Sequence, residues 1–254
     1  MGDGVRIGCK SARLAVPIAN RETTGAAAHG LIHAAAPLKG FMPEKERVIL
    51  LKTLTTVASV ALPIEERWSI KRCRYAPDGS SAGRVCIAAG THGDEMMGQL
   101  IIYLVQQRIA AHPDALRGTV DFYPMLNPLG LDIGERMVPS GTRLDMNRAF
   151  PGSPNGTPLE YMCHQVIQDM RGADLVLDLH ASARNKSELY EVRVSAKEAE
   201  RLLPRVRALC PQLIWVYPDK GSFSASLTGA LGAVGTDAVI LEADERRRLP
   251  QEIA

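Results

Sequence analysis

The sequence has 254 residues, of which 46% are hydrophobic and 23% charged. These proportions are typical of a soluble globular protein and exclude a disordered, collagen-like or coiled-coil chain. No apolar stretch approaches the roughly 18 residues that a membrane span needs. Thirty basic and 28 acidic residues leave a net charge of +2, which is too small to indicate a nucleic-acid-binding protein.

Residues 1–40 differ in composition from the rest of the chain. Nine of these 40 residues are Ala, with five basic and two acidic residues, and no hydrophobic period persists through them. A transit or interaction segment is one interpretation, but we expect a poorly ordered extension. Residues 41–254 are then expected to form the functional domain.

The cysteines and the N-terminus indicate the compartment. Five cysteines form no C-x-x-C pair, and Cys86 and Cys163 lie in apolar patterns that predict burial. The N-terminus lacks the compact apolar core of a signal peptide. We therefore expect a cytoplasmic protein with reduced thiols.

From about residue 84, predicted strands and helices alternate. Residues 85–89 form an apolar run that ends at Gly90 and predicts a strand buried on both faces. A helix should follow, because apolar residues recur three and four positions apart. They are Met97, Leu100, Ile101, Leu104 and Val105. Residues 119–125 predict a second strand.

The same alternation continues towards the C-terminus. An unbroken apolar stripe predicts a helix that contains Leu159, Met162, Cys163, Val166, Ile167 and Met170. Residues 175–179, 212–217 and 238–241 predict strands. Ser195-x-x-Glu198 matches a capping box, which should open a helix. This helix should carry Leu202, Leu203 and Val206 on one side. Pro204 should kink the helix or mark its boundary. The pattern predicts an α/β protein whose sheet is covered on both faces.

Two segments at predicted strand ends carry residues suited to bind a metal ion. In Gly-Thr-His92-Gly-Asp-Glu95, the His and the Glu are three positions apart, so a helical turn brings them together. Period two along the strand at 175–179 places Asp178 and His180 on one face. His92, Glu95 and His180 are therefore candidate zinc ligands, with Asp178 a candidate partner of His180. Each alone also fits a solvated pair or a structural histidine.

Two further regions supply polar candidates, namely the loop between these two segments and the end of the last predicted strand. A turn-rich stretch contains Arg136, Arg143, Asn147 and Arg148. Guanidinium and carboxamide groups suit a carboxylate, but composition alone favours a solvated, arginine-bearing loop. Glu242 ends the strand at 238–241, where a carboxylate facing metal-activated water is suited to act as general base. A salt bridge to the arginines at 246–248 is the structural alternative.

The order of these segments resembles a known family. H-G-D-E, N-P-x-G, an arginine, D-x-N-R-x-F-P-G, D-x-H and a late Glu are similar to the zinc carboxypeptidase superfamily, and more closely to its succinylglutamate desuccinylase and aspartoacylase branch. The resemblance covers about residues 84–243. It implies a three-layer α/β/α fold with a mixed sheet of about eight strands. It also implies one zinc ion per chain.

The resemblance implies a role for each matching residue. His92, Glu95 and His180 match the zinc ligands, and Glu242 matches the general acid/base. Asn147 and Arg148 match the pair that holds a substrate carboxylate. Arg136 matches the arginine that polarises the scissile carbonyl, with Arg143 as a rival, and Tyr217 is a candidate for the tyrosine of digestive carboxypeptidases by location only.

The implied activity is hydrolysis of an amide bond in a small N-acyl amino acid or peptide-like substrate that bears a carboxylate. A metallocarboxypeptidase-type peptidase and a non-catalytic zinc-binding protein of the same fold are the alternatives. Desuccinylase-like members carry a further β-rich subdomain after the catalytic Glu, whereas only 12 residues follow Glu242. We therefore expect a catalytic domain without that subdomain; the oligomeric state is left open.

Overall fold

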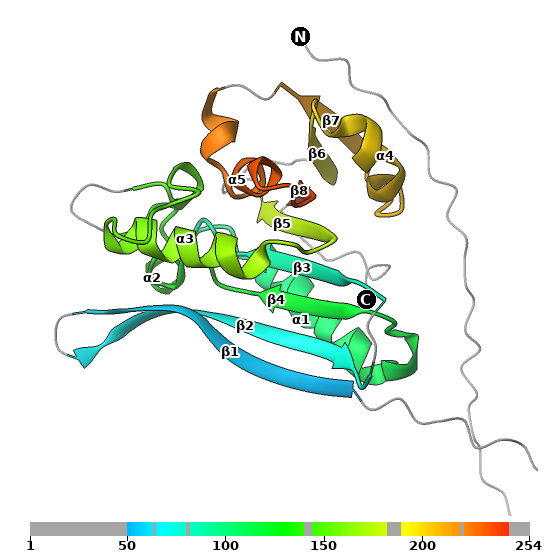
Figure 1. Ribbon diagram of the computed structural model, residues 1–254, viewed down its shortest axis with the longest axis horizontal. Coiled ribbons are helices and arrows are strands. Elements are labelled where there is room, and N and C mark those ends of the chain that lie inside the picture. Colours follow the sequence, from blue (N-terminus) through cyan, green and yellow to red (C-terminus); the bar gives the residue numbers. More distant parts are fainter. Residues whose placement is uncertain are drawn as a thin grey trace, which may run out of the picture. The chain divides into compact units, whose positions relative to one another are not determined.

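The computed structural model describes residues 50–62, 65–79, 82–139, 144–181, 189–218 and 221–243. Eight strands form one mixed sheet in the order β1-β2-β4-β3-β5-β8-β6-β7 (Figure 1). The strands are β1 (Leu50–Ala61), β2 (Arg67–Pro77), β3 (Arg84–Ala89), β4 (Thr119–Tyr123), β5 (Leu175–Ala181), β6 (Glu191–Ser195), β7 (Leu213–Tyr217) and β8 (Ala238–Ala243). The predicted mixed eight-stranded sheet is confirmed.

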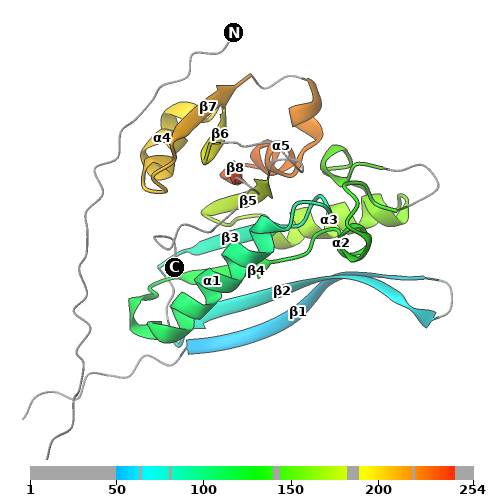
Figure 2. The same cartoon turned by 180° about the vertical axis from the view of Figure 1, so that it is seen from behind.

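Helices cover both faces of this sheet, as the sequence predicts. The helices are α1 (Met97–Ala111), α2 (Pro128–Ile133), α3 (Pro158–Met170), α4 (Ala199–Arg207) and α5 (Leu227–Ala233), with 3-10 turns at Pro113–Ala115, Met146–Arg148 and Gly221–Ala225. Helices α3 and α5 pack over one hydrophobic cluster, and α1 and α4 pack over the other (Figures 1 and 2). None of the helices in the described ranges is both long and apolar enough to cross a bilayer.

The parallel centre of the sheet explains why the polar candidates meet. Strand β3 runs parallel to β4 and β5, and β5 runs parallel to β8. The carboxyl ends of these strands therefore lie along one edge, which is where open α/β sheets place their ligands. The sequence predicts these four strands correctly, although the second ends at Tyr123 rather than at residue 125.

The side of helix α1 that packs against the sheet overlaps the predicted stripe through Ile101 and Val105 but is shifted around the helix. Its buried residues are Gly98 and Ile102, whereas Leu100 is 38% exposed. A Cβ atom at Gly98 would lie 2.7 Å from the Cβ of Ala89, so glycine allows the helix to approach β3 this closely. The apolar periodicity could not show this, because a glycine adds no hydrophobic signal to a helical stripe.

The prediction of a capping box at Ser195 is wrong. Ser195 is the last residue of β6, and α4 begins at Ala199 with Glu198 at the N-cap position and no side-chain cap hydrogen bond. Pro204 lies inside α4 rather than at its boundary. By contrast, all six apolar residues predicted for the helix before β5 are buried in α3, which begins with a capping box between Thr157 and Glu160.

The hairpin formed by β1 and β2 is anchored to the sheet by buried charges. Asp121 of β4 is fully buried and accepts two hydrogen bonds from Arg74, both 2.7 Å long, and one of 2.7 Å from Arg84. These contacts join β2, β4 and β3. Because a buried ion that loses its partner is strongly destabilising, by about 3–5 kcal/mol, this network holds the hairpin in register.

The prediction that residues 1–40 form an extension lies outside the described residues. Cys86 and Cys163 are buried free thiols, as predicted. Burial raises the pKa of the Cys86 thiol to about 12, so this cysteine is a core residue rather than a nucleophile.

Candidate active site

His92 and Glu95 lie in the turn that joins β3 to α1. The amide of Glu95 donates to the His92 carbonyl at 3.4 Å, and this turn brings the two side chains together. The Nδ1 atom of His92 lies 2.7 Å from Oε1 of Glu95. Both residues are buried, with exposed fractions of 3% and 5%. The spacing of three residues therefore produces the predicted pair.

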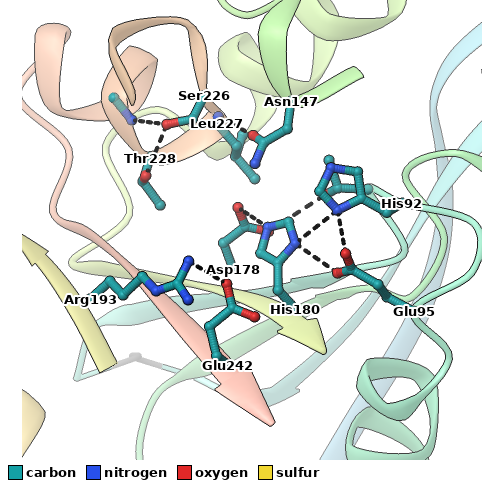
Figure 3. A network of polar contacts seen from close by, with 12 residues as sticks. His92, Glu95, Asn147, Asp178, His180, Arg193, Ser226, Leu227, Thr228 and Glu242 are labelled. Atoms are coloured by element: carbon teal, nitrogen blue, oxygen red, sulfur yellow. Dashed lines mark hydrogen bonds and ion pairs between the residues drawn. The ribbon is translucent and has the colours of Figure 1, made fainter. Parts of the chain in front are cut away.

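His180 joins this pair from β5. Its Nδ1 atom lies 2.9 Å from Oε2 of Glu95 and 3.2 Å from Nδ1 of His92 (Figure 3). The candidate ligand atoms of the three residues all lie within 4.8 Å of one another. The structure thus assembles one cluster from side chains 88 residues apart in sequence.

A carboxylate holds the outer nitrogen of each histidine. Nε2 of His92 lies 3.2 Å from Oδ1 of Asp145, and Nε2 of His180 lies 3.0 Å from Oδ2 of Asp178. A carboxylate only accepts hydrogen bonds, so each Nε2 carries the proton in the neutral ring, and the Nδ1 lone pairs face the centre of the cluster. The predicted pairing of Asp178 with His180 is present, whereas the role of Asp145 was not predicted.

The cluster has the chemistry and spacing of a zinc site with an open position. Two imidazoles and one carboxylate are a ligand set of catalytic zinc, and bonds of 2.0–2.1 Å in a tetrahedron separate ligand atoms by about 3.3 Å. Here the two Nδ1 atoms lie 3.2 Å apart, and each lies within 2.9 Å of one oxygen of Glu95, Oε1 for His92 and Oε2 for His180. Two Nδ1 atoms facing each other at such a distance also favour a cation between them. The residues therefore fit the ion.

Electrostatic coupling inside the cluster favours the charged forms of its members. Burial opposes the charge on Glu95, but hydrogen bonds with His180 and His92 outweigh it and lower the pKa of Glu95. Burial likewise opposes protonation of both histidines. Contacts with Asp145 and Glu95 outweigh burial and raise the pKa of His92. Contacts with Asp178 and Glu95 outweigh burial and raise the pKa of His180. A metal ion would compete with protons for the two Nδ1 atoms, because a ligating imidazole is neutral.

The loop before α3 brings three of the predicted polar residues to the same edge. Nη1 of Arg136 donates to Oε1 of Glu95 at 2.9 Å, and its side chain is 40% exposed. Asn147 is buried, and its Oδ1 accepts a 3.0 Å hydrogen bond from the amide of Leu227 at the start of α5. Arg148 is exposed, and its Nη1 donates to the Asn147 carbonyl at 2.6 Å.

Asp145 connects these loop residues to the histidine cluster. Besides His92, it accepts a 2.8 Å hydrogen bond from the amide of Asn147 and lies 3.5 Å from Nη2 of Arg136. The ring of His92 and the backbone of Asn147 outweigh the effect of burial, with Arg136 also contributing, and lower the pKa of Asp145 to about 2. Its place two residues before Asn147, as the N-cap of a 3-10 turn, is the sequence signal that could have identified it.

Glu242 lies beside His180 because their strands are paired. The two residues are register partners in the parallel strands β5 and β8, and neighbouring residues in register face the same side of a sheet. The Glu242 carboxylate pairs with Nη1 of Arg193 at 2.8 Å (Figure 3). The sequence did not predict Arg193 as a partner. The arginines at 246–248 and Arg143 lie outside the described residues.

Tyr217 differs from the other candidates in its surroundings. It ends β7, is 3% exposed and stacks on Phe223 with ring centroids 4.3 Å apart. A role of Tyr217 in the site stays a prediction.

Two glycines explain why the first two motifs lie together. A Cβ atom on Gly93 of H-G-D-E would collide with backbone atoms of Gly130 and Glu135. Gly130 belongs to N-P-x-G, whose Asn127 caps α2 by accepting from the Gly130 amide at 2.9 Å. The two turns are therefore in direct backbone contact beside the cluster, an approach that a larger side chain would prevent.

Comparisons to known proteins identify the family of this chain. Residues 81–254 match the family model of the succinylglutamate desuccinylase/aspartoacylase catalytic domain. The chain therefore belongs to this family. It is also 33% identical over 101 residues to N-alpha-acetyl-L-2,4-diaminobutyric acid deacetylase from Halomonas elongata, a match that covers 39% of this chain and 28% of that protein.

Solved structures share the fold at low sequence identity. A succinylglutamate desuccinylase/aspartoacylase from Rhodobacter sphaeroides has a TM-score of 0.63 at 22% identity, over 80% of this chain and 61% of that one. The ectoine utilization protein EutE (DoeB) from Ruegeria pomeroyi has a TM-score of 0.64 at 16% identity, and the match covers 82% of this chain and 64% of that one. A metallo-carboxypeptidase from Burkholderia cenocepacia has a TM-score of 0.57 at 17% identity, and the match covers 76% of this chain and 55% of that one. The matches thus span less than two thirds of these relatives.

Proposed function

We propose that this protein is a zinc-dependent hydrolase that cleaves the amide bond of a small N-acyl amino acid or peptide-like substrate bearing a carboxylate. The observation that carries the proposal is the cluster of His92, Glu95 and His180, with Glu242 in register beside it. Membership of the desuccinylase/aspartoacylase family supports deacylation. The deacetylase relative from Halomonas elongata, by its name, acts on an N-acetylated amino acid.

In this proposal His92, Glu95 and His180 hold one zinc ion per chain. When bound, zinc supplies Lewis-acid chemistry that polarises a carbonyl and makes water more acidic. Asp145 and Asp178 keep both imidazoles in the tautomer that binds the ion, through their 3.2 and 3.0 Å contacts. Glu95 completes the set, and its hydrogen bonds with His180 and His92 lower the pKa of its carboxyl group, which favours the ionised form that binds a metal ion.

Glu242 would move the proton. As general base it removes a proton from the attacking water and later delivers that proton to the nitrogen of the leaving amine. The C–N bond breaks, and a carboxylic acid and an amine leave. Both transfers occur on the side of the sheet where His180 and Glu242 are neighbours.

Arg136 is suited to stabilise the oxyanion that forms from the carbonyl. Its guanidinium lies beside Glu95 and remains 40% exposed, so a substrate can reach it. One donor to an oxyanion contributes roughly 3–4 kcal/mol in well-studied hydrolases.

Asn147 and Arg148 would hold the substrate carboxylate. Asn147 is fixed by Leu227, and Arg148 is exposed beside it, so a fixed amide and an accessible guanidinium are presented together. A guanidinium offers a carboxylate two parallel donors, which an ammonium group does not reproduce.

Arg148→Lys is therefore expected to raise KM at least about tenfold for a substrate with a free carboxylate, which corresponds to the loss of one charge-assisted hydrogen bond. Zinc content and the free energy of unfolding should not change, and kcat can fall if the same contact aligns the scissile bond. Steady-state kinetics on the acid and on its amide measure the effect. The amide should be a poor substrate of the wild type and lose little more in the variant. An equal rise in KM for the acid and for its amide would show that Arg148 has a structural role.

A hydrolysis panel tests the proposed function as a whole. Zinc-loaded protein should release free amines from N-acetyl, N-succinyl or other N-acyl amino acids, and a chelator should abolish the reaction until zinc is restored. Cleavage of dipeptides instead would identify a metallocarboxypeptidase-type peptidase. Stoichiometric zinc without turnover on any substrate would indicate a non-catalytic zinc-binding member of the family.

A further inference from the structure

Arg193 of β6 contacts the acid that we assign as general base. Its Nη1 pairs with Oε1 of Glu242 at 2.8 Å, and its Nε donates to Oε1 of Glu191 at 2.6 Å. We propose that Arg193 is a positioning residue that fixes the orientation of the Glu242 carboxylate for proton transfer. This inference rests on the proposed function of Glu242.

The sheet creates the need for such a residue. Strands β6 and β8 are antiparallel, with Glu191 directly opposite Glu242. Both glutamates are buried, with exposed fractions of 9% and 8%. Like charges directly opposite each other on adjacent strands destabilise a sheet. Arg193 lies between the two carboxylates and binds one oxygen of each, so its charge offsets a repulsion that would otherwise turn Glu242 away.

The guanidinium itself is held from several directions. It lies over the ring of Trp215 in β7, with the central carbon 5.0 Å from the ring centroid, and the side chain is only 22% exposed. A planar fork held by two acids and an aromatic ring has little freedom to rotate. Arg193 therefore provides a rigid support for Glu242.

This support orients the Glu242 carboxylate. The 2.8 Å contact engages Oε1, and the other oxygen points away from Arg193 (Figure 3). Removing Arg193 should therefore disturb proton transfer while leaving the zinc ligands and the carboxylate-binding pair in place. The expected signature is a loss in kcat with little change in KM.

A double-mutant cycle tests whether Arg193 acts through Glu242. Zinc-loaded Arg193→Gln should lose about 10- to 100-fold in kcat, the range that a displaced catalytic group produces, with KM within about threefold. Arg193→Lys keeps the charge but cannot bridge both acids, so it should recover part of that loss. The double variant Arg193→Gln/Glu242→Gln should be no slower than Glu242→Gln alone, because residues that act as a unit are not additive.

Arg205→Gln is the matched control. Arg205 also pairs with an acid, Asp237, at 2.9 Å, but it is 44% exposed and lies on α4. This variant should retain wild-type kcat and KM. Two results would overturn the assignment of Arg193. One is a kcat of the double variant reduced by the product of the two losses measured in Arg193→Gln and Glu242→Gln. The other is a rise in KM, with kcat unchanged, in Arg193→Gln.

Crystal structures of the wild type and Arg193→Gln, each loaded with zinc, provide a readout that needs no substrate. The Glu242 carboxylate should change its orientation in the variant, while His92, Glu95 and His180 stay in place. An unmoved Glu242 would overturn the inference, whatever the kinetics. Absence of hydrolysis by the wild type would overturn the proposed function instead, and the two structures would still show whether Arg193 positions Glu242.

Discussion

His180→Ala should abolish zinc binding and hydrolysis together. The wild type is expected to hold about one zinc per chain through two imidazoles and one carboxylate, and the variant would retain only two of these three ligands. His180 has an exposed fraction of 4% and its Nδ1 faces both other candidate ligands, so the substitution removes a nitrogen from the inside of the cluster. Elemental analysis after dialysis and the hydrolysis assay measure both effects.

His112→Ala is the control for this experiment. His112 is an exposed histidine at the end of α1, and it caps the helix through its backbone rather than its imidazole. Its zinc content and activity should match the wild type. If His180→Ala kept its full complement of zinc, the imidazole would not be a ligand and the site would need a different composition. The same test applies to His92→Ala.

Glu242→Gln should separate zinc binding from chemistry. The amide has the shape of the acid but cannot accept the proton of water, so turnover should fall by roughly 10²–10⁴-fold while zinc content is unchanged. Because Arg193 can still donate to the amide oxygen, the free energy of unfolding should change little. Steady-state kinetics with parallel zinc analysis measure the two quantities.

Glu200→Gln, an exposed glutamate in the first turn of α4, is the matched control and should leave both quantities unaltered. Loss of zinc together with activity in Glu242→Gln would place Glu242 among the ligands. The general base would then have to be another group, and the role inferred for Arg193 would not hold.

The elements that carry the candidate metal ligands could be predicted because their signals are local. The strand before His92 is a continuous apolar run, and the strand that ends near His180 alternates leucines with Asp178 and His180. Both patterns survive in the structure as β3 and β5. The proximity of their ends follows from parallel pairing alone.

The hairpin of β1 and β2 was not predicted from the sequence. β1 is largely exposed, and the two alternating apolar pairs of β2, Trp68 with Ile70 and Cys73 with Tyr75, are separated by Lys71 and Arg72. Arg74 of the same strand binds Asp121, which lies 47 residues away along the chain. An apolar alternation that is interrupted and interspersed with charged residues is a weak strand signal.

The supporting residues of the site were missed because they meet their partners only in the folded chain. Arg193 meets Glu242 only after β6 pairs antiparallel with β8, and Asp145 meets His92 across 53 residues of sequence. The capping-box error at Ser195 arose because β6 extends through that serine. Motifs indicate which side chains are chemically able to act, whereas pairing of strands determines which of them meet.

The register between His180 and Glu242 fixes the spacing of these two side chains independently of the loops around them. The spacing of the two side chains is set by hydrogen-bonded backbone in β5 and β8, and a slip of one residue would turn Glu242 to the opposite face. The segments that would contact the rest of a substrate, such as the turn at Asn147 and Arg148, lie outside this pairing. In the proposed function, insertions or replacements there would alter the acyl group or amine that is accepted, while the distance between the proposed ligand His180 and the proposed base Glu242 stays constant. Substrate preference can therefore diversify without rebuilding the cleavage chemistry.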